Sequence, residues 1–238
     1  MSIIIGAHVH DGIVVASDTR TTVIDGNGNT MYKDDAVKII PFPNRMVVAH
    51  CGDANVSKNM TVNEFLIRCR VEFGNGCRIF DLPTKLLSEF KKLNVFADIT
   101  FLVAGFYNSG FGSCIYKVET KNKIISMPWC DGTYGASYYG ANKISDSILN
   151  GADYDSMSLT GAIDLISLAV NTTIKAYSFR NPQSVGGQCR MYVLSTDDKC
   201  VGWYTNGKIL TDKDAPIDSY EHLMQAKTEQ IMEQGSKG

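Results

Sequence analysis

Short apolar runs separated by polar turns open the chain, and this pattern predicts β-strands rather than helices. Ser2–His10 and Ile13–Asp18 meet at a His-Asp-Gly turn, so we predict a first hairpin. A second strand pair is predicted at Val37–Pro41 and Arg45–Cys51. The stretch Thr21–Asp35 between the two pairs is polar and carries glycine-containing turns, which predicts a loop.

Helical and strand patterns then alternate in blocks along the rest of the chain. Asp53 is a candidate N-cap for a helix that extends to about Phe73. The other predicted elements are a helix at Pro83–Leu93, strands at Ile99–Phe106, Ser113–Glu119 and Lys123–Trp129, helices at Ser137–Asn150 and Leu159–Phe179, a hairpin of Gly187–Ser195 and Cys200–Tyr204, and a terminal helix at Asp218–Gln234. This order places two groups of helices outside strands that stack on each other. With no repeat or linker, it predicts one domain over residues 1–238.

Charge and hydropathy exclude several classes of partner. The chain carries 23 Lys and Arg against 25 Asp and Glu, a net charge of −2, and shows no basic stripe. We therefore expect no nucleic-acid partner. The first apolar run, Ile3 to Ile5, is far too short for a membrane span or a signal core and has no basic leader. We expect a cytoplasmic protein with no membrane partner.

The cysteine pattern indicates reduced thiols rather than disulfides or zinc ligands. Seven cysteines are an odd number, and none are spaced as C-x-x-C. His8 and His10 share a strand face, but no carboxylate or thiol follows at a metal-binding spacing. We interpret the two histidines as ordinary strand residues and expect neither a metal nor a cofactor.

The candidate chemistry begins at Ser2, directly behind the initiator methionine. A small second residue usually permits removal of Met1, which would leave Ser2 with a free α-amine of reference pKa about 7.7–8.0. A hydroxyl activated by its own amine is a known nucleophile. The alternative is that Ser2 is only the solvated start of an edge strand.

Two further features favour the catalytic interpretation. Lys38 lies inside the apolar run Ala36–Ile40, where a cation is costly unless a carboxylate pairs with it, and Asp18 is the candidate. A cation held near the start of the chain would lower the pKa of a neighbouring hydroxyl or amine. Gly52 ends another strand, and its N–H is a candidate donor to an oxyanion.

Several motifs in order along the chain resemble the catalytic β-subunits of the proteasome, including the simpler bacterial ones, which are N-terminal-nucleophile hydrolases. These motifs are Ser2, Asp18, Arg20, Lys38, the turn Gly52-Asp53-Ala54, and the later elements Gly135-Ala136-Ser137 and Val185-Gly186-Gly187. The resemblance covers nearly the whole chain. It implies an α+β fold, a four-layer α-β-β-α sandwich.

The resemblance also implies a mechanism for peptide hydrolysis. Ser2 attacks the amide carbonyl, its amine takes the proton, and an acyl-ester forms that water hydrolyses. Lys38, held by Asp18, keeps the site positive, and the Gly52 N–H receives the oxyanion. Arg20 is interpreted as a structural partner of the carboxylate.

The chain departs from the family near the N-terminal amine. Where the family places an aspartate and a serine, this sequence has Asn181-Pro182 and Ala136-Ser137. Asn181 retains a carbonyl that can accept from the amine, and Ser137 lies one position from the expected place. We therefore include both as candidate catalytic residues.

The resemblance further places His50 at the base of a pocket for the substrate side chain that precedes the cut bond. Its walls would be Thr21, Ala36, Ile40 and Ala54. Because an ordinary imidazole titrates near pH 6.5, we expect cleavage after acidic residues to increase as the pH falls through that value.

Assembly is expected because the Leu159–Phe179 helix is apolar on more than one face. The resemblance implies a homo-oligomeric ring, with two stacked rings of six or seven subunits each. It also implies peptide or unfolded protein as the substrate and an ATP-dependent unfoldase as a possible partner.

Two alternatives stay open. One is an N-terminal-nucleophile amidase or acyl-transfer enzyme on a small molecule. The other is a non-catalytic ring subunit that retains Met1, although the costly Asp18–Lys38 pair argues against it.

Overall fold

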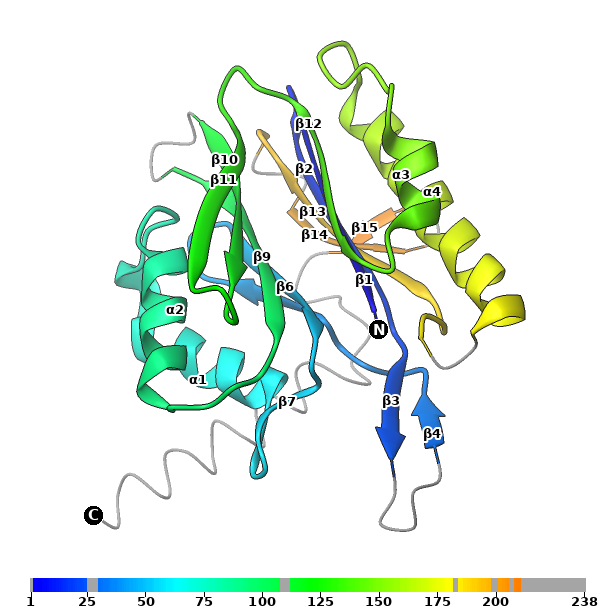
Figure 1. Ribbon diagram of the computed structural model, residues 1–238. Helices are drawn as coiled ribbons and strands as arrows, with labels where there is room; N and C mark the ends of the chain where they lie inside the picture. The colour runs from blue at the N-terminus through cyan, green and yellow to red at the C-terminus, as the bar shows by residue number, and fades with distance from the viewer. Residues whose placement is uncertain are drawn as a thin grey trace.

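Two large antiparallel sheets form the centre of the computed structural model, which describes residues 2–24, 30–107, 112–181, 184–197, 201–205 and 208–210. The six-stranded sheet has the order β12-β1-β2-β13-β14-β15. Its strands are β1 Ile3–Val9, β2 Gly12–Asp18, β12 Gly135–Gly140, β13 Cys189–Ser195, β14 Val201–Thr205 and β15 Lys208–Leu210. The predicted first and last hairpins thus lie side by side in one sheet, with β13 next to β2 (Figure 1).

The five-stranded sheet has the order β11-β10-β9-β6-β5. Its strands are β5 Ile39–Phe42, β6 Met46–Gly52, β9 Ile99–Phe106, β10 Ser113–Glu119 and β11 Ile124–Cys130. Strand β9 lies between β6 and β10, and β11 is an edge strand. The bounds predicted for β9 and β10 are confirmed, because both strands read as apolar runs between clear turn signals.

Helices cover the outer side of each large sheet, with one pair of helices on each (Figure 1). They are α1 Val62–Phe73 and α2 Leu82–Lys92, joined by a short 3-10 turn at Gly74–Gly76, and α3 Lys143–Leu149 and α4 Leu159–Arg180. One apolar cluster joins α1 and α2 to the five-stranded sheet, and a second joins α3 and α4 to the six-stranded sheet. A third cluster fills the space between the sheets, with Ile4 and Val15 facing Val47 and Leu102.

This packing explains why β1 and β2 read as continuous apolar runs rather than alternating ones. All residues of both strands are buried, because one face packs on α4 and the other on the second sheet. Strands covered on both faces lose the polar positions that a half-exposed strand would show. The hairpin therefore fixes the position of its two ends, Ser2 and Asp18, in the molecule.

The predicted four-layer α-β-β-α sandwich is wrong as a description of this chain. The described residues form a mixed α/β fold with four antiparallel sheets, because two small sheets lie outside the large ones. One pairs β3 (Thr21–Ile24) with β4 (Thr30–Lys33), and the other pairs β7 (Asn55–Ser57) with β8 (Met60–Thr61). The first occupies the predicted loop Thr21–Asp35 and projects from the body of the molecule (Figure 1). Its Met31 and Tyr32 side chains are about half exposed, so this strand pair has no buried face whose apolar pattern would have predicted it.

Helix α1 begins later than predicted. Thr61, rather than Asp53, is its N-cap, and Thr61 and Glu64 form a reciprocal capping box. The predicted first turns of this helix are occupied by β7 and β8, and the Asp53 side chain instead accepts the Asp98 N–H at 2.8 Å. The Thr-x-x-Glu signal was present in the sequence and marks the true start.

The helix predicted at Ser137–Asn150 is also wrong in its first half. Gly135–Gly140 forms strand β12, which pairs with β1, and α3 begins only at Lys143. The two adjacent tyrosines at 138 and 139 favour a strand here, since aromatic side chains fit a pleated surface. The terminal helix predicted at 218–234 lies outside the described residues.

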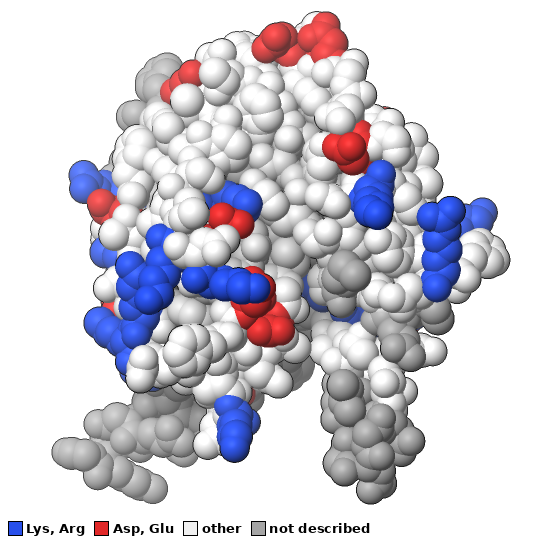
Figure 2. Space-filling view, viewed as in Figure 1, with Lys and Arg blue, Asp and Glu red and all other residues white. Residues whose placement is uncertain are grey.

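Charged side chains are spread unevenly over the surface. In Figure 2, Lys and Arg gather over the flank that α1 and α2 form, with acidic side chains between them. Two ion pairs on this flank, Arg78–Asp81 and Lys92–Glu89, mix the two signs of charge. Across the described part of the chain, no helix combines the length and apolar character that crossing a membrane needs.

Candidate active site

Ser2 lies at the start of β1 and is in contact with Lys38 from a different part of the chain. Its side chain is buried, with 9% of its surface exposed. The Lys38 Nζ donates a hydrogen bond to Ser2 Oγ over 2.9 Å and forms an ion pair with Asp18 Oδ1 over 2.6 Å. A hydroxyl, a cation and a carboxylate that are separated in the sequence therefore form one connected group.

Asp18 is fully buried and has hydrogen-bond donors at both of its oxygens. Besides Lys38, Oδ1 accepts the Ile3 N–H at 3.1 Å, while Oδ2 accepts the N–H groups of Arg20 at 3.3 Å and Gly186 at 3.2 Å. A buried carboxylate without such partners would be very unfavourable. These contacts fix the carboxylate that in turn fixes Lys38.

Burial acts against the charge of Lys38. Loss of solvation lowers the pKa of its ammonium group, and the charge and hydrogen bond of Asp18 act in the opposite direction. The lysine is only 4% exposed. Its proton is therefore easier to transfer than that of a solvated lysine, while the adjacent carboxylate still favours the cation.

A cleft of about 960 Å³ opens at Ser2. Its lining includes Ser2 and Lys38, and four of the residues predicted to form a substrate pocket: Thr21, Ala36, His50 and Ala54. Gly52 also lines it, at the end of β6. Ile40, the fifth predicted pocket residue, instead packs in the apolar core under α1 and α2 and is 1% exposed.

His50 differs from the ordinary imidazole assumed from the sequence. Burial lowers its pKa to about 4, although a hydrogen bond with Asn63 partly opposes the effect. The His50 Nε2 and Asn63 Oδ1 atoms are 2.9 Å apart. With this lowered pKa His50 is neutral at neutral pH, so we no longer expect it to change charge near pH 6.5. Asn63 was not singled out from the sequence, because its contact joins α1 to β6 and leaves no local sequence signal.

Gly52 has a backbone conformation that other residues rarely adopt, with φ of 111°. A Cβ at this position would lie 2.1 Å from the Asp98 carbonyl oxygen. The following Asp53 N–H donates to that same oxygen at 3.0 Å. The end of β6 thus packs against Asp98, the residue before β9, at the point where Gly52 lines the cleft.

Ser137 and Asn181, the candidates for the family's serine and aspartate near the N-terminal amine, lie away from the cleft at Ser2. Ser137 is opposite Gly6 in the sheet, and its hydroxyl accepts from the Trp129 Nε1 at 2.9 Å. Asn181 is the exposed C-cap of α4, and its carbonyl accepts the Ser184 N–H at 3.1 Å. Neither is among the described residues that line the cleft.

Gly140 and Ala141 are the residues of this segment that contact Ser2. The Ala141 N–H donates to the Ser2 carbonyl at 2.9 Å. A Cβ on Gly140, whose φ is 91°, would lie only 1.8 Å from the same oxygen, so only glycine fits. Gly140 was not singled out from the sequence, because a helix was predicted over it.

Arg20 binds Asp34 rather than the side chain of Asp18. Its Nε and a terminal nitrogen each donate to an Asp34 carboxylate oxygen over 2.6 Å, and the guanidinium lies 4.7 Å from the Tyr32 ring centre. This pair ties the start of β3 to the end of β4. Asp34 was not singled out from the sequence.

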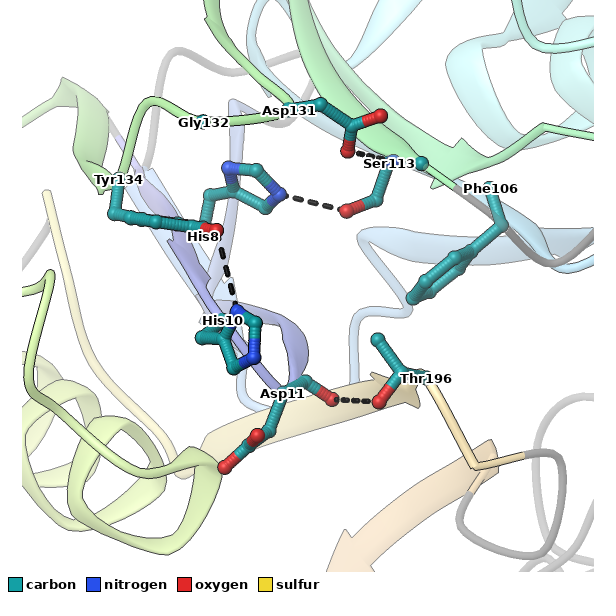
Figure 3. A pocket seen from close by; sticks show the side chains of 10 residues that line it. His8, His10, Asp11, Phe106, Ser113, Asp131, Gly132, Tyr134 and Thr196 are labelled. Atoms are coloured by element: carbon teal, nitrogen blue, oxygen red, sulfur yellow. Dashed lines mark hydrogen bonds between the residues drawn. The ribbon is translucent and has the colours of Figure 1, made fainter.

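A second pocket, of about 520 Å³, lies at the far end of β1 (Figure 3). There His8 Nε2 is 2.6 Å from Ser113 Oγ, and His8 Nδ1 is 2.7 Å from the Thr133 carbonyl oxygen. Asp131 accepts the Ser113 N–H at 2.8 Å. Figure 3 shows Tyr134 and Phe106 on opposite sides of the opening. The described residues contain no group of three or more His, Cys, Asp or Glu placed to hold a metal ion.

Comparisons with known proteins give a likeness in structure alone. No family model matches the chain, and no curated protein sequence matches it. A solved structure of a Gly-1 mutant of Anbu from Hyphomicrobium sp. strain MC1 is 16% identical, with a TM-score of 0.65, over 100% of this chain and 98% of that one. Another structure of Anbu from the same organism is 16% identical, with a TM-score of 0.66, over 99% and 97%.

These matches correct the assignment that was made from the motifs. The motifs were assigned to the catalytic β-subunits of the proteasome, whereas the two similar structures described above are of Anbu, a bacterial proteasome-like subunit of the N-terminal-nucleophile hydrolase type. At 16% identity they establish that this chain shares the fold.

Proposed function

We propose that this chain is a proteasome-like N-terminal-nucleophile hydrolase that cleaves peptide bonds through an acyl-ester on Ser2. The single observation that carries the proposal is the contact of Lys38 Nζ with both Ser2 Oγ and Asp18. A buried ion pair contributes little net stability compared with an apolar pair, so its place against the first hydroxyl of the chain favours a chemical role.

The mechanism begins with removal of Met1, which gives Ser2 a free amine. That amine takes the proton of the Ser2 hydroxyl as Oγ bonds to the substrate carbonyl carbon. The Lys38 cation stabilises the developing negative charge on Oγ. When the C–N bond breaks, the proton passes to the leaving amine. Water then attacks the acyl-ester and releases the acid product and the free hydroxyl.

Substrate recognition is assigned to the cleft beside Ser2. The Gly52 N–H is the proposed donor to the oxyanion, since Gly52 lines the same cleft. The neutral His50, among Thr21, Ala36 and Ala54, favours a polar or medium-sized apolar side chain before the cut bond. Ser137 and Asn181 contact other groups and have no part in this mechanism.

We also propose that the chain assembles into a homo-oligomeric ring. Support comes from α4, on which Leu168 is 57% and Phe179 83% exposed. Apolar side chains of this size on a helix surface favour contact with another chain. Two stacked rings of six or seven subunits, enclosing the Ser2 sites, remain the proposed arrangement, with an ATP-dependent unfoldase as a possible partner.

The test combines intact mass with peptide hydrolysis. We expect active protein to lack Met1, and Ser2→Ala to lose all turnover while keeping its fold. Ser17→Ala is the matched control, because the buried Ser17 hydroxyl, one residue before Asp18, has no hydrogen-bond partner among the described residues. Hydrolysis that persists with Met1 fully retained would exclude the mechanism.

The same preparation separates the peptidase from a small-molecule amidase. Light scattering should give an assembly many times the monomer mass of about 26 kDa. A monomer that hydrolyses small amides but not peptides would favour the amidase, with the same Ser2 nucleophile.

A further inference from the structure

Cys114 and Cys130 lie directly opposite each other on neighbouring antiparallel strands. Cys114 is in β10 and Cys130 is at the end of the edge strand β11. Residues directly opposite in an antiparallel pair project from the same face of the sheet. Accordingly, Cys114 is fully buried in the apolar cluster under α1 and α2, and Cys130 packs against that cluster.

The main-chain hydrogen bonds show which kind of cross-strand pair this is. The Cys130 N–H donates to Thr133 Oγ1 at 2.9 Å, and the Cys130 carbonyl accepts the Thr133 N–H at 2.9 Å. Both main-chain groups of Cys130 are therefore bonded to the turn that follows β11. They do not exchange hydrogen bonds with Cys114.

The hydrogen bonds between β10 and β9 lead to the same conclusion about Cys114. The Tyr107 N–H donates to the Gly112 carbonyl at 3.0 Å, so these two residues are a hydrogen-bonded pair between β9 and β10. Such pairs alternate along an antiparallel ladder, so two residues further on Cys114 bonds to Gly105. The main chain of Cys114 faces away from β11.

Cys114 and Cys130 are thus a non-hydrogen-bonded pair, the closer of the two kinds, with Cα atoms about 4.5 Å apart in regular sheets. Disulfides span Cα separations of roughly 4.4–6.8 Å. We propose that Cys114 and Cys130 form a redox-active dithiol that a low-molecular-weight disulfide, of the glutathione disulfide class, oxidises to a cross-strand disulfide.

The reaction proceeds in two thiol–disulfide exchanges. The thiolate of Cys130, which is the partly exposed member, attacks the small disulfide and releases one small thiolate. Cys114 then attacks the Cys130 sulfur and releases the second. Two protein thiols are oxidised, and one small disulfide is reduced to two thiols. Burial raises the pKa of Cys114 to about 12, although hydrogen bonds from Tyr107 and Tyr116 act in the opposite direction. The second exchange should therefore accelerate as the pH rises.

The other described cysteines have no cysteine opposite them in a sheet. Cys51 is opposite Thr100 and Cys189 is opposite Asp18, while Cys69 lies in α1 and Cys77 lies outside the strands, between the 3-10 turn and α2. These cysteines serve as controls, because they can react with the small disulfide but have no facing thiol with which to form a cross-strand disulfide.

The disulfide would attach the edge strand to the sheet beside the second pocket. Ser113 precedes Cys114 and Asp131 follows Cys130, and these two residues already share a hydrogen bond (Figure 3). Ile124 and Met127 of β11 are 49% and 45% exposed, so little packing holds this strand. Oxidation is therefore expected to protect β11 from local opening.

The test treats the full-length protein with glutathione disulfide and maps its peptides without reduction. Trypsin cuts after Lys117 and Lys123, between the two cysteines, so the disulfide joins two peptides. We expect this joined pair in the wild type and in Cys69→Ser, its loss in Cys130→Ser, and increased hydrogen-exchange protection of β11 after oxidation of the wild type.

Two results would overturn the proposal, and both are read on the wild-type protein, so they do not depend on how a variant folds. One is that both thiols stay free under conditions that oxidise a small dithiol standard. The other is a stable glutathione adduct on Cys130 while Cys114 stays reduced at high pH.

Discussion

Strand β1 joins two sites in which a buried serine hydroxyl contacts a side-chain nitrogen. At its start, Ser2 Oγ is 2.9 Å from Lys38 Nζ, and near its end Ser113 Oγ is 2.6 Å from His8 Nε2. Six residues at about 3.3 Å each place the two sites roughly 20 Å apart. Both hydroxyls are mostly buried, at 9% and 5% exposure. A hydroxyl in contact with a side-chain nitrogen therefore does not by itself distinguish a nucleophile from a structural contact.

The difference between the sites lies in the charges around each hydroxyl. Beside Ser2 a cation is fixed by Asp18, so negative charge that develops on Oγ is stabilised. At the second site the Thr133 carbonyl can only accept, so His8 Nδ1 carries the hydrogen and Nε2 accepts the Ser113 hydroxyl. The Ser113 N–H is bonded to the Asp131 carboxylate, which would repel an oxyanion.

Burial strengthens the contrast. It lowers the pKa of His8, which keeps the imidazole neutral and its hydrogen bonds intact at neutral pH. The comparison therefore favours the Ser2 end of β1 for the proposed chemistry and a structural role for the His8–Ser113 pair.

Replacing each serine in turn should give the largest contrast. Ser2→Ala is expected to abolish peptide hydrolysis, whereas Ser113→Ala should leave the rate within about threefold of wild type, less than 1 kcal/mol of barrier. Ser113→Ala should instead lower the free energy of unfolding by about 1–3 kcal/mol, because His8 loses a buried partner. Steady-state rates and denaturant unfolding of both variants measure this. The comparison fails if Ser113→Ala loses as much activity as Ser2→Ala.

Replacing Lys38 and His8 in turn should give the next largest difference. Lys38→Ala should reduce the rate by about a hundred- to a thousand-fold or more, as loss of a charge-stabilising donor does. It should also destabilise the fold by about 3–5 kcal/mol, because Asp18 stays buried without its partner. His8→Gln, at the other site, should leave the rate nearly unchanged.

A double variant separates the two effects of the lysine. Lys38→Met with Asp18→Asn removes both charges, so stability should recover relative to Lys38→Ala while activity stays lost. Recovery of activity together with stability would show that Lys38 acts only through the fold.

The smallest expected effect concerns pH at the cleft. Because the His50 pKa is lowered to about 4, cleavage preference for acidic against apolar side chains should stay constant between pH 5.5 and 8. The unfolded chain binds a proton at this histidine near pH 6.5 and the folded chain only near 4, so stability is complete above 6.5 and decreases as the pH falls toward 4. The loss is about 3 kcal/mol at most. Comparing wild type with His50→Gln across this range isolates it, and a preference that changes near pH 6.5 would contradict the lowered pKa.

The charged pair of the site could be predicted because it carries a physical cost, whereas the cleft residues were expected only from the family resemblance. A lysine in an apolar strand needs a carboxylate, and Asp18, at the end of another predicted strand, is the candidate. The structure brings Ser2, Asp18 and Lys38 together, and Thr21, Ala36, His50, Gly52 and Ala54 around them. The long apolar strands and α4 were equally visible because their burial leaves continuous patterns.

The rest could not be predicted because it depends on contacts without a periodic signal. The β3–β4 ribbon is held by cross-strand pairs and by Arg20–Asp34, outside the two large sheets. Gly140 acts through the absence of a side chain beside Ser2, which becomes visible only when β12 is placed next to β1. The pKa of His50 depends on burial, which its sequence neighbours do not fix.

Trapping the nucleophile tests the central claim most directly. The full-length protein, freed of Met1, is incubated with a peptide carrying an electrophilic carbonyl group, and the site of modification is mapped by mass spectrometry. We predict one adduct per chain, on Ser2, that is lost in Ser2→Ala and retained in Ser113→Ala. An adduct on Ser113, or peptide hydrolysis by protein that forms no adduct at Ser2, would contradict the account.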